Sequence, residues 1–143
     1  MQRLIDTLQA TSCSLVVEDS QGQMTTYFKK GVRDLVWLLD HEPQRLQGAR
    51  VADKVVGKAS AGLLAVGGVR QVYAQVMSRR AVPVLDQAGI SHTCGLLVDR
   101  IVIPDGDNRC PLEQIVAPAT TPHDIETLLR RHFQERALAA QHK

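Results

Sequence analysis

The pattern of apolar and polar positions divides the chain into short runs that are typical of strands and helices. The runs "CSLVVED" and "QMTTYFK" flank the polar segment "SQGQ", and this arrangement predicts a β-hairpin. Two later runs, "VRQVYAQV" and "ISHTCGLLV", are also predicted to be strands. The first half of the chain therefore begins with paired strands, and further strands follow at longer intervals.

Apolar residues spaced three or four positions apart predict the helices. These helices are expected at residues 2–10, 31–42, about 50–66, 78–89, 110–116 and 121–140. In the third of them, Ala52, Val55, Val56, Ala59, Leu63 and Val66 form one apolar stripe, and Gly67 and Gly68 follow as a helix end. Ser78 and Thr121 are expected to cap the helices that they begin.

Strands that alternate with helices after an opening hairpin indicate an α/β fold. We expect a three-layer α/β/α sandwich with a mixed sheet. The 143 residues fit one domain, 1–143, and a chain of this length can bury a core without disulfides.

Composition and charge exclude several classes of partner. The net charge is only +2, the basic residues are scattered, and aromatic residues make up 3% of the chain, so nucleic acid is not an expected partner. No apolar run reaches the roughly 18 residues of a membrane span. Three widely spaced cysteines and a polar N-terminus favour a cytoplasmic protein with reduced thiols.

Four segments carry a resemblance to a known family. In chain order they read "VADKVVGKA", "GGVRQVYAQVMS", "LDQAGI" and "RCPLEQIV". They resemble a small bacterial family of unknown function with a cytidine-deaminase-like fold, over about residues 13–118. The run "DKVVGKA" also resembles a segment of the formate dehydrogenase accessory sulfurtransferases, which share that fold. The resemblance implies a single deaminase-like domain, followed by a helix at about residues 121–140.

The chain departs from zinc deaminases at the metal-binding motifs. Those enzymes place His-Ala-Glu or Cys-Ala-Glu at the start of the second helix and Pro-Cys-x-x-Cys at the start of the third. The corresponding stretches here read "VADK" and "MSRRA", without His, Cys or Glu. The resemblance therefore implies a member that lacks the zinc ligands. We expect no metal, no cofactor and no hydrolytic deamination.

The predicted helix 50–66 carries the first set of candidate site residues. Asp53, Gly57 and Ser60 would share one face, and Lys54 and Lys58 would form a neighbouring row. Small residues would let a ligand approach the backbone, while Asp53 accepts a hydrogen bond and a lysine holds a phosphate or carboxylate. The same small residues equally favour close packing of the helix against its neighbours.

The second set of candidates lies at two further predicted helix starts. Cys110 precedes Pro111, and a helix start together with Arg109 would lower the pKa of its thiol, as a nucleophile or sulfur carrier requires. Alternatively, Cys110 is a small buried residue at the start of the helix, and Glu113 closes a capping box there. Ser78 and Arg79, with Arg80, could bind an anion or face solvent.

Two weaker patterns complete the set of candidates. Asn108 lies in the turn before Cys110 and fits either a ligand contact or ordinary turn chemistry. His92 and Cys94 would face the same side of a strand, so with Cys110 they could form a three-ligand metal site.

Two functions are compatible with these patterns. The first is a zinc-free protein that binds a small nucleotide-like or anionic ligand between two helix starts. Asp53 and Cys110 would be its catalytic candidates, and its ligand-binding candidates are Lys54, Gly57, Lys58, Ser78, Arg79 and Asn108. The second is a non-catalytic regulatory or interaction domain that kept the scaffold. The first function predicts that Asp53, Ser78 and Cys110 converge on one hollow. A homodimer is the expected assembly.

Overall fold

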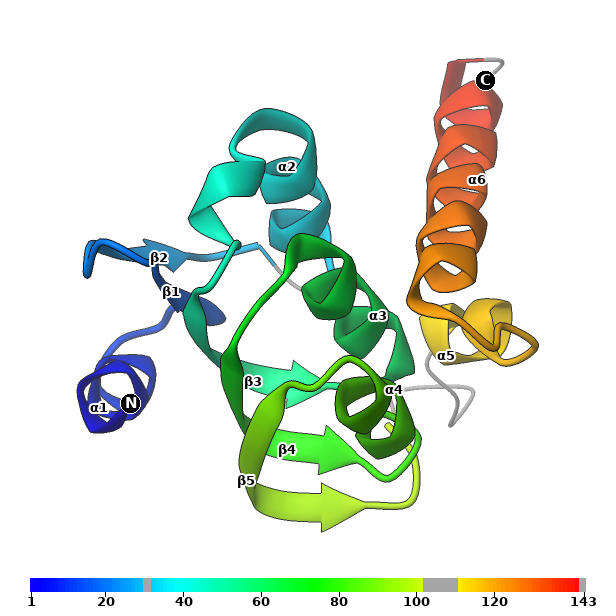
Figure 1. The fold of residues 1–143 in the computed structure, drawn as a ribbon. Helices are drawn as coiled ribbons and strands as arrows, with labels where there is room; N and C mark the ends of the chain where they lie inside the picture. Colours follow the sequence, from blue (N-terminus) through cyan, green and yellow to red (C-terminus); the bar gives the residue numbers. More distant parts are fainter. Residues whose placement is uncertain (30–31, 102–110, 142–143) are drawn as a thin grey trace.

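The structure consists of one sheet with helices on both of its faces (Figure 1). It is a computed structural model that describes residues 1–29, 32–101 and 111–141. The strands are β1 (Leu15–Glu18), β2 (Met24–Tyr27), β3 (Arg50–Val56), β4 (Gln71–Ser78) and β5 (Ser91–Val98). The helices are α1 (Gln2–Ala10), α2 (Arg33–His41), the short 3₁₀ helix η1 (Pro43–Arg45), α3 (Lys58–Gly67), α4 (Val82–Gln87), α5 (Pro111–Val116) and α6 (Pro122–Gln141).

The five strands lie in the order β2-β1-β3-β4-β5. Strand β1 pairs antiparallel with both β2 and β3, whereas β3, β4 and β5 are parallel. Helices α3 and α4 provide the crossover connections that the parallel pairs require. The predicted hairpin, the mixed sheet and the α/β class are therefore confirmed.

Alternate residues of the strands pack on opposite faces of the sheet. In β1, Leu15 and Val17 belong to the larger core cluster, and Val16 belongs to a smaller one with Leu4 and Leu8 of α1. The other helices pack on the larger cluster, which contains Leu35 and Leu38 of α2, Leu63 and Leu64 of α3, Leu85 of α4, and Ile125 and Leu129 of α6. Helix α1 thus covers part of one face, and the remaining helices cover the other.

The predicted helix at 50–66 is wrong in its first half. Residues Arg50–Val56 form strand β3, and the helix begins only at Lys58. Strand β3 lies between β1 and β4, and Val51, Ala52 and Val56 are all buried. A strand covered on both faces loses its polar alternation, so its apolar run continued the stripe of the following helix.

The predicted helix at 78–89 begins later than expected. Strand β4 continues through Ser78, and α4 starts at Val82 with Pro83 in its first turn. The buried Ser78 hydroxyl accepts a hydrogen bond from the Arg80 backbone N–H at 3.1 Å, which stabilises the turn between strand and helix. Ser78 is therefore the end of a strand rather than a helix cap. By contrast, the predicted Thr121 cap of α6 is confirmed, because its hydroxyl accepts the Asp124 N–H at 3.1 Å.

Candidate functional site

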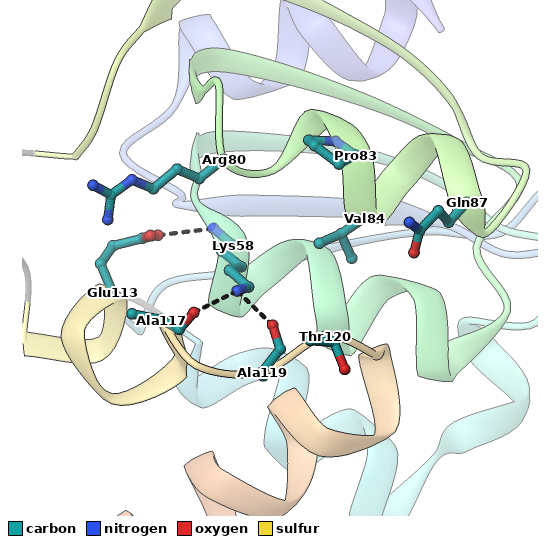
Figure 2. Close-up of a pocket in the computed structure, with 9 residues that line it drawn as sticks. All are labelled: Lys58, Arg80, Pro83, Val84, Gln87, Glu113, Ala117, Ala119 and Thr120. Carbon is teal, nitrogen blue, oxygen red and sulfur yellow. Dashed lines mark hydrogen bonds between the residues drawn. The ribbon is translucent and has the colours of Figure 1, made fainter.

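A cavity of about 490 Å³ lies between the start of α3, helix α4 and the segment that joins α5 to α6. Its charged side chains are Lys58, Arg80 and Glu113, and Pro83 and Val84 of α4 form part of an apolar wall (Figure 2). The cavity therefore combines a charged side with an apolar side, as small-molecule sites commonly do.

Glu113 connects α5 to the first turn of α3. Its Oε1 accepts a hydrogen bond from the Lys58 backbone N–H at 2.8 Å. No side chain at the Gly57 cap position supplies this bond. A Cβ at residue 57 would overlap Glu113 Oε1, so glycine at this position is what lets the carboxylate reach the helix. Glu113 thus satisfies one of the free N–H groups at the start of α3 from a distant part of the chain.

Lys58 makes a second connection, from α3 to the segment that follows α5. Its Nζ donates hydrogen bonds to the carbonyl oxygens of Ala117, at 3.0 Å, and Ala119, at 2.6 Å (Figure 2). A cation near the last carbonyls of a helix is electrostatically favourable. The start of α3 is therefore held to α5 and to the segment that follows it by two charged groups.

The Glu113 carboxyl group is buried, with 5% of the residue exposed. Burial raises its pKa, while the hydrogen bond from Lys58 and the positive charges of Arg80 and Lys58 act against this rise. Its second oxygen, Oε2, is buried and has no hydrogen-bond partner among the described residues. An unpaired carboxyl oxygen in a protein interior costs free energy, and this one lies in the wall of the cavity that Lys58 and Arg80 also line.

Asp53 of β3 and Asp34 of α2 are two buried carboxyl groups outside this cavity. The Asp53 Oδ1 accepts the Val55 backbone N–H at 3.2 Å, and Asp34 Oδ2 accepts the Lys29 N–H at 3.0 Å. The pKa of Asp53 is raised to about 7, mainly by burial and to a small extent by the Asp34 charge, against the effect of its backbone hydrogen bonds. Burial also raises the pKa of Asp34. Both carboxyl groups therefore keep their proton to a higher pH in the fold than an exposed aspartate does.

The family described as Domain of unknown function (DUF1893) matches residues 3–133. This chain belongs to the DUF1893 family. A crystal structure of a DUF1893 family protein from Thermotoga maritima is similar to it, with a TM-score of 0.81 and 23% identity, over 92% of this chain and 88% of that chain. At that identity the likeness shows the fold alone. No curated protein matches the chain.

The DUF1893 chain brings only part of the predicted ligand-binding set to the cavity. Lys58 lines it, and Gly57 lies against Glu113. Asp53 and Ser78 are not among the lining residues, so these two do not converge on this cavity as expected. Arg79 points elsewhere and pairs with Asp99 at 2.9 Å.

The remaining candidates of this DUF1893 chain lie outside the cavity or outside the described residues. Lys54 is half-buried on β3, whereas Asn108 and Cys110 belong to the part of the chain that is not described. Within the described ranges, no three His, Cys, Asp or Glu side chains gather as metal ligands. His92 instead contacts Asp86 at 2.7 Å. None of the helices in residues 1–29, 32–101 and 111–141 has the length and hydropathy to cross a membrane.

Glu113 and Arg80 line the cavity although the sequence did not place them in the predicted ligand-binding set. The sequence offered Glu113 as one partner in a capping box at the start of its own helix, and in the structure its Oε1 accepts the Lys58 N–H at the start of α3. Arg79 and Arg80 are adjacent in the sequence, but only Arg80 lines the cavity. The local signal in the sequence is Gly57 directly before the apolar helix. Glycine has no side chain to accept a hydrogen bond from the first turn of the helix, so another part of the chain can supply the acceptor.

Proposed function

We propose that this DUF1893 protein binds a small anionic, nucleotide-like ligand in the cavity between α3, α4 and α5. The observation that carries the proposal is the unpaired Glu113 Oε2, which is buried in the wall of a cavity that Lys58 and Arg80 also line. The volume of about 490 Å³ falls within the range of roughly 300–1,000 Å³ that is usual for small-molecule sites.

Each wall of the cavity supports one part of such a ligand. The Arg80 guanidinium is exposed and can bind a phosphate or carboxylate through two parallel hydrogen bonds. Lys58 uses two of its three ammonium protons on backbone carbonyls, which leaves one donor for the ligand. Glu113 Oε2 would accept an N–H or O–H of the ligand, and Pro83 and Val84 offer an apolar surface to a ring.

The finer features of the fold are part of the same proposal. The sheet would be the centre of a three-layer, cytidine-deaminase-like sandwich that works without zinc, in the cytoplasm of a bacterium. Its mixed strand order supports this arrangement, as does the position of α1 opposite the other helices. In this proposal, ligand binding does not require Cys110, and thiol chemistry at Cys110 would be a further activity of the bound state.

Calorimetric titration with two probes, inorganic phosphate and cytidine 5′-monophosphate, tests the proposal. We expect saturable binding of the nucleotide, and Arg80→Ala should weaken it at least tenfold, the order of one lost charge-assisted contact of about 1.5–3 kcal/mol. Arg79→Ala is the matched control, because Arg79 pairs with Asp99 outside the cavity. Equal losses in the two variants would contradict the site.

Native mass spectrometry of freshly purified protein provides the second measurement. A co-purified small anion that is lost in Arg80→Ala supports the proposal. If no anion co-purifies and neither probe binds the wild-type chain, the proposal is wrong. Stoichiometric zinc in the same spectra would overturn its metal-free part.

A further inference from the structure

The buried carboxyl group of Glu113 lies at one end of the cavity between α3, α4 and α5. Helix α4 runs along this cavity, so Arg80 precedes its start and Gln87 lies at its end. Figure 2 shows Glu113 and Arg80 at one end and Gln87 at the other, with Val84 between them. Burial raises the pKa of Glu113, and the nearby positive charge of Arg80 acts against this rise. An anion bound by Arg80 would therefore have Glu113 Oε2 as a close neighbour.

The unpaired Oε2 of Glu113 limits which ligand group can lie beside it. The other oxygen, Oε1, already accepts the Lys58 backbone N–H, so only Oε2 is free for a ligand. An ammonium group fits poorly, because Arg80 and Lys58 would repel a further cation. A hydroxyl group fits whether or not Glu113 carries a proton, because it can donate to an ionised oxygen and accept from a protonated one. The free oxygen therefore favours a neutral hydroxyl group.

The order of groups along the cavity matches the order of groups in a nucleotide. A phosphate bound by Arg80 would place the attached sugar, with its hydroxyl groups, beside Glu113 Oε2. The base would then extend along Pro83 and Val84 toward Gln87, whose amide can form a hydrogen bond with the edge of a base. The base lies farther from the phosphate than the sugar hydroxyls do. Glu113 is therefore placed to contact the sugar rather than the base.

We propose that Glu113 selects a nucleotide with an intact ribose, by pairing its Oε2 with a ribose hydroxyl group. This inference rests on the proposed function and names the part of the ligand that the carboxyl group recognises. The hydrogen bond of 2.8 Å between Oε1 and the Lys58 N–H holds the carboxyl group in place before the ligand binds. A nucleotide without the hydroxyl would leave Oε2 buried and unpaired in the complex, and a site of this kind rejects such an analogue.

Calorimetric titration of the full chain with cytidine 5′-monophosphate and its 2′-deoxy and 3′-deoxy analogues tests this inference. We expect at least one analogue to bind about tenfold or more weakly than the parent nucleotide, the order of one lost hydrogen bond to a charged group. In Glu113→Ala this difference should shrink to less than about threefold, because the partner of the hydroxyl is gone. Gln114→Ala is the matched control and should keep the full difference, since Gln114 is exposed on the same helix and does not line the cavity.

The outcomes separate this inference from the proposed function on which it rests. Equal binding of all three nucleotides by the wild-type chain would overturn the role of Glu113 and leave the proposed function standing. This comparison needs no variant, so it decides the inference even where Glu113→Ala does not fold, which circular dichroism checks. A difference that persists in a folded Glu113→Ala would also overturn the inference, because another group would then recognise the hydroxyl. If none of the three nucleotides binds, both the proposed function and this inference are wrong.

Discussion

Gly57 and Glu113 lie so close that any side chain at position 57 would occupy the place of the Glu113 carboxylate. A Cβ at Gly57 would overlap Glu113 Oε1 and would lie 3.0 Å from Glu113 Cδ. Glycine at position 57 is therefore what allows Glu113 to accept the hydrogen bond from the Lys58 N–H. This relationship joins α3 to α5 and forms one side of the proposed ligand cavity.

The first prediction concerns this contact directly. Gly57→Ala should lower the free energy of unfolding by about 1–3 kcal/mol, because overpacking forces the buried Glu113 side chain away. Urea denaturation measures the loss. In a Glu113→Ala background the same substitution should cost much less, since the clashing atoms are gone. Losses that simply add in the double variant would contradict a direct contact.

The second prediction concerns the ammonium group of Lys58. Lys58→Met keeps much of the aliphatic stem but removes both hydrogen bonds to the segment that follows α5. We expect a loss of about 2 kcal/mol in the free energy of unfolding, because bonds from a charged donor are worth roughly 1.5–3 kcal/mol each and water replaces part of them. Lys54→Met on β3 is the control, and it should change the stability by less than about 0.5 kcal/mol.

The third prediction concerns the pH dependence of stability. The pKa of Asp53 is raised from 3.8 to about 7 in the fold, so the folded state binds this proton more tightly than the unfolded state. The contribution of Asp53 to stability is complete below pH 4 and is lost as pH rises toward 7 and above. At about 1.4 kcal/mol per pH unit, the loss over this window is of the order of 4 kcal/mol.

The variant Asp53→Asn separates this effect from other titrations. The amide side chain of this variant has no titrating proton to lose, so the fall in unfolding free energy between pH 4 and pH 7 should become much shallower. A smaller fall should persist, because the pKa values of Asp34 and Glu113 are raised in the same direction. Urea denaturation at a series of pH values provides the measurement. An unchanged slope in Asp53→Asn would show that Asp53 ionises in the fold at its ordinary pKa.

The fourth prediction concerns the thiol of Cys110, which lies outside the described residues. If a helix start lowers its pKa, iodoacetamide should label it at neutral pH faster than a free model thiol. Cys13 is buried and Cys94 is half-buried, so Cys110→Ser should remove the fast phase. A rate no faster than that of the model thiol would remove the nucleophile from the proposed function.

Local patterns predicted most of the elements correctly. The hairpin, α1, α2, β5 and α6 all lie within a residue or two of their predicted positions, because each has a periodicity and an end signal of its own. The cap at Thr121 is one such signal. The helix prediction for residues 50–56 was wrong because a strand covered on both faces has no polar alternation. The apolar spacing of the helix after Gly57 therefore seemed to continue back through this strand.

The sequence by itself determined the α/β class, the hairpin and most of the helices, since these follow from the spacing of apolar residues over short stretches. It also singled out Gly57 and Lys58. Only the tertiary structure decided that Glu113 and Arg80 join them at one cavity, and that Asp53 is buried away from it. The physical reason is that a buried carboxylate needs donors close in space, and packing of α5 against α3 brings these donors from a distant part of the chain.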